Sequence, residues 1–208
     1  LLSRGLGDVY KRQLLTRQLD AIAQAAANRG EEATTWVMAP MVATAVEAKW
    51  FADLCRERGL TAGAMIEVPA AALMADTIMP HLDFVSIGTN DLTQYTMAAD
   101  RLSPQLAYLT DPWQPAVLRL IQHTCVVGRD NNVPVGVCGE AAADPMLACV
   151  LTGLGVTSLS AASTAVAGVG AQLAELTFEQ CEKMAEAAVN AEGPSEARTN
   201  VIALLEEF

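Results

Sequence analysis

Four side chains suited to acid–base or ligand chemistry stand at the ends of apolar runs of the sequence. Glu67, Asn90 and Asp91 each come just after such a run, and Cys138 closes another. If these runs are neighbouring strands, the carboxylates of Glu67 and Asp91 point into one mouth. Two carboxylates suit Mg²⁺, which keeps several waters and binds phosphate-bearing ligands through few protein groups. The spacing therefore predicts a site for an anionic ligand that is held through a divalent cation.

Arg101 stands out because basic residues are scarce around it. Between positions 60 and 180 the lysines and arginines are Arg101, Arg119 and Arg129, and the last two fall in a helical pattern. A guanidinium binds a carboxylate or a phosphate through two parallel hydrogen bonds. Asn90 lies in a predicted turn that begins at Gly88, where a glycine lets the backbone approach a ligand closely. Arg101 and Asn90 are therefore candidate anion ligands.

Short apolar runs alternate along the chain with segments of helical periodicity, a pattern typical of βαβ units. The predicted strands cover residues 36–39, 62–66, 84–87, 133–138 and 156–160. The predicted helices cover residues 14–28, 45–58 after a Thr44 cap, 70–79, 115–130, 145–152, 164–176, 178–189 and 195–207. Residues 88–91 are expected to form a turn, which leads into a long excursion that carries Arg101.

Two α/β architectures compete for this pattern, an open doubly wound sheet and a (β/α)8 barrel. The open sheet usually binds a nucleotide through a glycine-rich first turn, but the chain has no GxGxxG and no GxxxxGK[ST]. A barrel places polar residues just past the carboxyl ends of several strands, as observed here. A complete barrel needs eight strands and roughly 250 residues. We therefore predict a truncated TIM-type barrel, made of about its last five βα units and C-terminal helices.

The composition excludes several classes of protein. The chain has 208 residues, of which 52% are hydrophobic and 18% charged, as expected for one folded domain. The net charge of −11 argues against a nucleic-acid partner. No apolar run is long enough for a membrane span and no secretory leader opens the chain. The five cysteines contain no CxxC pair, so reduced thiols and a cytoplasmic location are expected.

Residues 1–13 differ from the rest of the sequence. They carry three basic residues and one acid, whereas the remainder of the chain is strongly acidic, and they show no clear period. We interpret residues 1–13 as a non-native or disordered leader and residues 14–208 as a partial barrel domain. The alternative is a genuine flexible N-terminus.

The longest motif of the chain is DFVSIGTNDLTQY at residues 83–95, and it is accompanied by MIEVPAA at 65–71, MAADR at 97–101 and VCGE at 137–140. Together these segments resemble the signature of the phosphoenolpyruvate-utilising enzymes. They are similar above all to the phosphoenolpyruvate–protein phosphotransferases, the enzyme I family of the bacterial sugar phosphotransferase system. The resemblance extends from Leu14 to about Phe208.

The resemblance implies a role for each candidate residue. It implies that Glu67 and Asp91 hold Mg²⁺ and that Asn90, Asp91 and Arg101 bind phosphoenolpyruvate in a barrel domain. Loss of the phosphoryl group leaves an enolate whose C3 must be protonated, and the resemblance assigns this to Cys138. An ordinary thiol has a pKa of about 8.5, so it is mostly protonated at neutral pH and can act as the acid.

The chain departs from the family at its remaining cationic positions. Arg17 is a candidate substrate ligand, although the family more often has this arginine one place earlier, at Thr16. Trp36 stands where related chains often carry another arginine. The family phosphorylates a histidine on a separate N-terminal domain, and neither His81 nor His123 has the expected surroundings. The chain alone is therefore not expected to complete phosphotransfer.

The implied reaction is transfer of the phosphoryl group from phosphoenolpyruvate to a protein histidine, with release of pyruvate. The histidine would then pass the group to a small histidine-containing phosphocarrier protein, and the family forms homodimers through this domain. An alternative within the superfamily is a pyruvate phosphate dikinase or phosphoenolpyruvate synthase. A non-enzymatic alternative is a phosphoenolpyruvate-sensing or dimerisation module.

Overall fold

A five-stranded parallel sheet forms the centre of the computed structural model, which describes residues 9–29 and 34–208. Its order follows the chain: β1 (Trp36–Ala39), β2 (Thr61–Ile66), β3 (Phe84–Gly88), β4 (Val135–Cys138) and β5 (Ser158–Ser160). Every neighbouring pair is parallel. The predicted α/β fold with five βα units is confirmed, and each strand lies within two residues of its predicted bounds.

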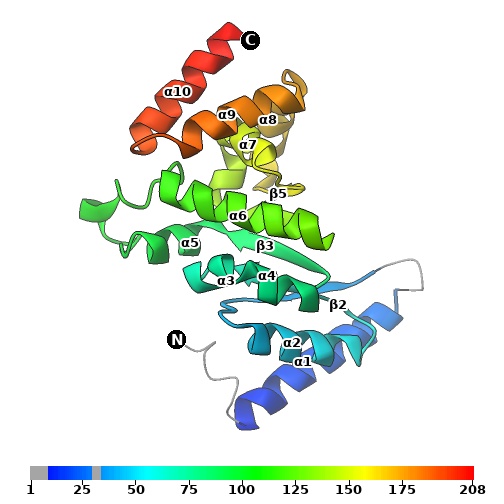
Figure 1. The fold of residues 1–208 in the computed structure, drawn as a ribbon. Coiled ribbons are helices and arrows are strands. Elements are labelled where there is room, and N and C mark those ends of the chain that lie inside the picture. Colours follow the sequence, from blue (N-terminus) through cyan, green and yellow to red (C-terminus); the bar gives the residue numbers. More distant parts are fainter. Residues whose placement is uncertain (1–8, 30–33) are drawn as a thin grey trace.

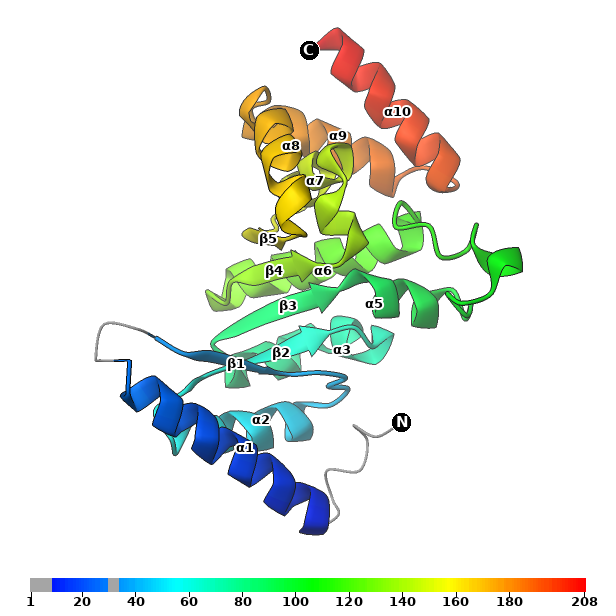
Figure 2. The same cartoon turned by 180° about the vertical axis from the view of Figure 1, so that it is seen from behind.

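The part of the chain that the structure describes contains ten α-helices besides this sheet. They are α1 (Val9–Ala27), α2 (Ala45–Arg56), α3 (Pro69–Leu73), α4 (Ala75–Ile78), α5 (Thr89–Thr96), α6 (Pro115–Asn131), α7 (Pro145–Gly153), α8 (Ser163–Ala174), α9 (Phe178–Val189) and α10 (Pro194–Glu207). Helices α3, α4 and α6 cover one face of the sheet (Figure 1). Figure 2 shows β1–β4 from the opposite side, which these helices leave open.

Alternating burial along the strands separates the two faces. Val85, Ile87, Val135 and Val137 are buried in the core together with apolar residues of α6. The residues between them point to the other face, because successive side chains of a strand alternate. Cys138 is one of these and is only partly buried. The strands thus turn one face to the core, and the side chains of β4 on the other face are less buried.

The helix after β1 starts as its sequence predicts. Thr44 caps α2 by accepting a hydrogen bond from the Glu47 N–H, and the Glu47 side chain accepts from the Thr44 N–H. This reciprocal capping box satisfies two free backbone donors. The predicted helix over residues 70–79, in contrast, is divided into α3 and α4, because Met74 leaves the helical conformation (φ −102°, ψ 24°).

The turn predicted over residues 88–91 is wrong, because α5 begins at Thr89 directly after β3. Gly88 precedes the helix with a non-helical backbone (φ −85°, ψ 87°). Threonine, asparagine and aspartate favour turns, but they also favour the first turn of a helix, where an acidic side chain faces free N–H groups. The same residue types therefore fit both structures, and Asn90 and Asp91 lie on a helix.

Helix α1 begins at Val9, five residues before its predicted start. The Arg12 guanidinium lies 5.8 Å from the centre of the Trp50 ring on α2, and the Arg12 carbonyl accepts a hydrogen bond from the Thr16 hydroxyl. Residues 9–13 are thus helical, while residues 1–8 lie outside the described residues. The non-native origin of residues 1–13 stays a prediction. Among the helices described, none has the length and apolar character needed to cross a membrane.

Candidate functional site

The carboxyl ends of β2, β3 and β4 bring the predicted residues to one edge of the sheet. Ile66 pairs with Ile87, and Gly88 pairs with Cys138. The residue after Ile66 is Glu67, so Glu67, Gly88 and Cys138 stand side by side at the same level of three adjacent strands. This is the arrangement that the sequence predicted from the positions of the strands.

Glu67 is held firmly, with one carboxylate oxygen occupied and the other against the backbone of β3. It is 3% exposed, and its Oε1 accepts a hydrogen bond of 2.7 Å from the Met41 N–H. Met41 lies in the segment between β1 and α2 and has a positive φ of 57°. A Cβ atom added to Gly88 would lie 2.6 Å from Glu67 Oε2. Gly88 therefore makes room for the Glu67 carboxylate.

The Glu67 carboxyl lies in surroundings that oppose its charge. Burial raises the pKa of the Glu67 carboxyl, the hydrogen bond from Met41 lowers it, and the negative charge of Asp91 raises it further. Asp91 lies in the first turn of α5 and is partly buried. A cation beside Glu67 would offset both the burial and the nearby negative charge.

Hydrogen bonds join the end of β3 to the end of β4. The Thr89 hydroxyl donates a hydrogen bond of 3.0 Å to the Cys138 carbonyl. The Cys138 thiol donates in turn to the Ile87 carbonyl, at a distance of 3.5 Å. Gly139 has a φ of 99°, and a Cβ atom there would lie 2.9 Å from Thr89 Oγ1 and 3.3 Å from Asn90 Oδ1. The Asn90 amide thus lies against the residue that follows Cys138.

The two predicted arginines lie apart from these residues. Arg101 is exposed in the loop between α5 and α6, and its backbone N–H donates to Gln94 Oε1 at 3.3 Å. This loop projects beyond the end of α5 in Figures 1 and 2. Arg17 is exposed on α1. Within residues 9–29 and 34–208, no contact found joins either guanidinium to Glu67 or Asp91.

The two carboxylates at this edge are suited to a cation whose remaining ligands are waters or substrate oxygens. No group of three or more histidine, cysteine or acidic residues able to hold a metal is found among the described residues. Mg²⁺ needs only one or two protein carboxylates, because waters and substrate phosphates complete its octahedron. Glu67 Oε2 and the Asp91 carboxylate are the available oxygens, since Oε1 of Glu67 already accepts from Met41.

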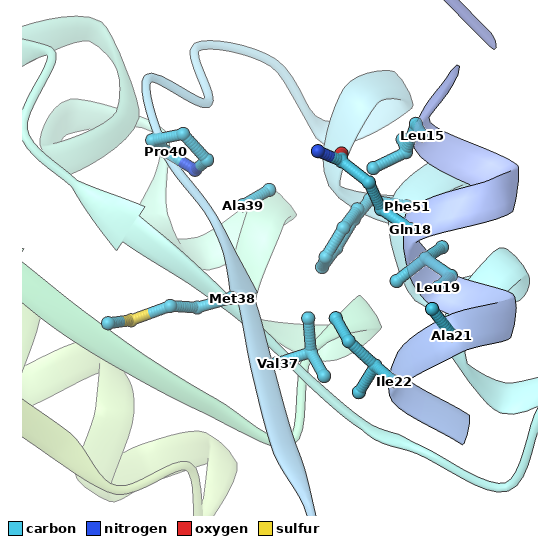
Figure 3. Close-up of a pocket in the computed structure, with 10 residues that line it drawn as sticks. All are labelled: Leu15, Gln18, Leu19, Ala21, Ile22, Val37, Met38, Ala39, Pro40 and Phe51. Atoms are coloured by element: carbon cyan, nitrogen blue, oxygen red, sulfur yellow. The ribbon is translucent and has the colours of Figure 1, made fainter. Parts of the chain in front are cut away.

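A large apolar cavity lies away from these residues, between α1 and β1 (Figure 3). Its volume is about 570 Å³. Gln18 is the polar side chain among the ten that line it, while Met38 points away from α1. The lining residues are Leu15, Gln18, Leu19, Ala21, Ile22, Val37, Met38, Ala39, Pro40 and Phe51. Without a charged group, this cavity does not suit a small anion.

Sequence reasoning missed two residues that hold the site together. Thr89 is 2% exposed, and its hydroxyl joins β3 to β4. Its position between Gly88 and Asn90, inside the motif, was a usable signal. Met41 acts through its backbone N–H, which every residue except proline carries. The identity of its side chain therefore could not predict this hydrogen bond.

Comparison with known proteins identifies similar sequences. Residues 4–178 match the family described as "PEP-utilising enzyme, PEP-binding domain". The chain is 52% identical over 194 residues to the phosphoenolpyruvate-protein phosphotransferase of Streptomyces coelicolor, covering 92% of this chain and 34% of that protein. It is 41% identical over 192 residues to the multiphosphoryl transfer protein of Xanthomonas campestris pv. campestris, covering 89% and 23%. The chain thus spans about a third or less of the length of these relatives.

A solved structure shares the fold at low sequence identity. A citrate lyase from Burkholderia xenovorans LB400 superposes with a TM-score of 0.57 at 15% identity. The superposition covers 92% of this chain and 68% of that one. At this identity the likeness shows a common α/β architecture.

Proposed function

Because the chain belongs to the PEP-utilising enzymes, as their PEP-binding domain, we propose that it forms part of the substrate site of a phosphoenolpyruvate–protein phosphotransferase. In this reaction the bond between the enol oxygen and phosphorus breaks. The phosphoryl group passes to a protein histidine, and the enolate that remains is protonated at C3 to give pyruvate. The phosphotransfer names of both curated relatives support this reaction over that of a dikinase or synthase.

The observation that carries the proposal is the meeting of Glu67, Asn90, Asp91 and Cys138 at the carboxyl ends of β2, β3 and β4. Polar residues at this edge of a parallel α/β sheet form the active sites of barrel enzymes. The two carboxylates would hold Mg²⁺, which supplies positive charge next to the phosphate of the substrate. The same geometry leaves the Asn90 amide beside Gly139, where it can donate to an anion.

The remaining roles belong to side chains around the carboxylates. We assign proton donation to C3 of the enolate to Cys138, whose partly buried thiol lies at this edge, 3.5 Å from the Ile87 carbonyl. Arg101 binds the carboxylate or phosphate of the substrate when the α5–α6 loop folds towards the sheet. Arg17 is a further candidate ligand on α1. Both guanidiniums are exposed and therefore available to an incoming anion.

The rest of the reaction lies outside this chain. We propose that the phosphorylated histidine belongs to a separate domain of the full-length protein, which passes the group to a histidine-containing phosphocarrier protein. The chain spans 34% of the Streptomyces coelicolor relative, which leaves room for such a domain. A cytoplasmic homodimer with Mg²⁺ as cofactor is part of the same proposal, and the chain alone is inactive.

Two variants of the full-length protein test the site by separating binding from turnover. Asp91→Ala is expected to abolish the Mg²⁺ dependence of phosphoenolpyruvate binding in calorimetry, because one of two metal carboxylates is lost. Cys138→Ala is expected to keep Mg²⁺-dependent binding but to slow pyruvate formation about 10²-fold or more, the scale of one general acid.

The outcomes of this experiment are distinct. Retained Mg²⁺ dependence in Asp91→Ala would refute the metal assignment, and unchanged pyruvate formation in Cys138→Ala would refute the acid. Binding without any phosphoryl exchange in the parent protein would favour a sensor module. Glu186→Gln, an exposed carboxylate on α9, is the control and is expected to leave both measurements unchanged.

A further inference from the structure

Helix α10 is tied to the end of the loop that carries Arg101. The Arg198 guanidinium of α10 lies 3.3 Å from Asp111 Oδ1, and its carbon lies 5.2 Å from the centre of the Trp113 ring. Asp111 is 24% exposed and Arg198 40% exposed at their side chains. The pair is thus partly shielded from water, and the guanidinium also lies over the face of the Trp113 ring.

The Trp113 side chain also contacts the segment that follows Cys138. Trp113 is fully buried, and its Nε1–H donates a hydrogen bond of 3.1 Å to Asp144 Oδ2. The other oxygen of Asp144 accepts from the N–H groups of Met146 and Leu147 and so caps α7. Trp113 therefore joins the loop after β3 to the loop after β4.

Short-range hydrogen bonds make the end of the α5–α6 loop a rigid unit. Asp111 Oδ1 accepts from the Trp113 N–H at 2.9 Å, and Gln114 Nε2 donates to the Tyr108 carbonyl at 3.0 Å. Arg101 lies seven residues before Tyr108, the first residue of this unit, and its backbone N–H donates to Gln94 Oε1. A displacement of the unit would be passed along the loop to Arg101.

We propose that Trp113, Asp144 and Arg198 are positioning residues that hold the Arg101 loop beside the segment after Cys138, so that substrate affinity depends on helix α10. This inference rests on the proposed function, because it assigns the consequence to anion binding by Arg101. Among the described residues, no hydrogen bond or ion pair joins these three side chains to Glu67 or Asp91. They limit the positions that the loop can adopt and reduce the entropy that Arg101 loses on binding.

A double-mutant cycle in the full-length protein tests this role. Arg198→Met is expected to raise the KM for phosphoenolpyruvate about tenfold while kcat stays within about twofold. Trp113→Phe removes the hydrogen bond to Asp144 and keeps the ring, and we expect the same split. In an Arg101→Met background neither change should raise KM further, because the residue through which they act is gone.

Each result supports or overturns the inference. Full additivity with Arg101→Met, or an unchanged KM in Arg198→Met, overturns it. Arg198→Lys keeps the ion pair and should restore part of the affinity, and its failure to do so counts against the pair. Lys183→Met, which removes an exposed ion pair with Glu179 on α9, is the control. If the parent protein does not bind phosphoenolpyruvate, the proposed function itself fails before the cycle is measured.

Discussion

At the level of single residues, Glu67 is a carboxylate in surroundings that oppose its charge. Burial and the charge of Asp91 raise the pKa of Glu67, and only the Met41 N–H favours the ionised form. A carboxylate buried in this way costs stability at neutral pH. If Glu67 holds a cation, as we propose, the bound charge would offset this cost.

Glu67→Gln should make the protein more stable at neutral pH when divalent cations are chelated. The amide oxygen still accepts from Met41, while the buried charge is gone, so we expect a gain of about 1 kcal/mol, or roughly 2–4 °C in melting temperature. Because the folded-state pKa is raised, the penalty is absent below the unfolded pKa and grows as the pH rises. The gain should therefore vanish in thermal scans near pH 4.

The control for this prediction is an exposed carboxylate. Glu186→Gln on α9 is expected to leave the melting temperature unchanged at every pH. A lower melting temperature of Glu67→Gln at pH 7 would show that the carboxylate stabilises the apo fold, contrary to the direction of its pKa shift.

The rule that polar residues follow strand ends was enough to find Glu67, Asn90, Asp91 and Cys138. The structure places these residues at one edge of the sheet, and their roles remain proposals. The rule failed to find what holds them, because the Met41 N–H is a backbone group. Gly88 was expected to admit a ligand, but it accommodates the Glu67 carboxylate instead. Such contacts link segments that are distant in the sequence, and one local pattern does not contain them.

At the level of elements, the contact between α7 and α9 depends on the absence of a side chain. Gly153 ends α7, and a Cβ atom there would lie 2.0 Å from the Cys181 carbonyl oxygen of α9. The obstacle is backbone, which no change of rotamer can relieve. Helical periodicity predicted both helices correctly to within one residue, but it does not reveal which positions of two helices meet.

Gly153→Ala should separate the two helices and destabilise the protein by about 3 kcal/mol or more. Gly170→Ala in α8 is the matched control, since nothing lies within 4 Å of its added Cβ atom. We expect it to be neutral or to stabilise by about 0.5–1 kcal/mol, as alanine does in a helix. Urea unfolding midpoints of both variants measure the difference, and equal midpoints would contradict the close contact.

At the level of the whole molecule, the sheet ends in two strands with one partner each. Strands β1 and β5 are the outer strands in the described sheet, and β1 presents Trp36 and Met38 with 58% and 43% exposure. A closed barrel has no such edges. The number of strands was predictable from the sequence, whereas the position of the outer strands became known only from the pairing in the sheet.

We therefore expect the 208-residue chain to self-associate or to fold only partly when it is produced alone. Open strand edges with exposed apolar side chains pair with other chains. Met38→Lys places a charge on the β1 edge and should reduce the self-association measured by light scattering. Lys183→Met, far from this edge, should leave it unchanged. A monomeric chain with a sharp cooperative melt would show that the five-stranded unit is stable by itself, and the edges would then need no further segment to cover them.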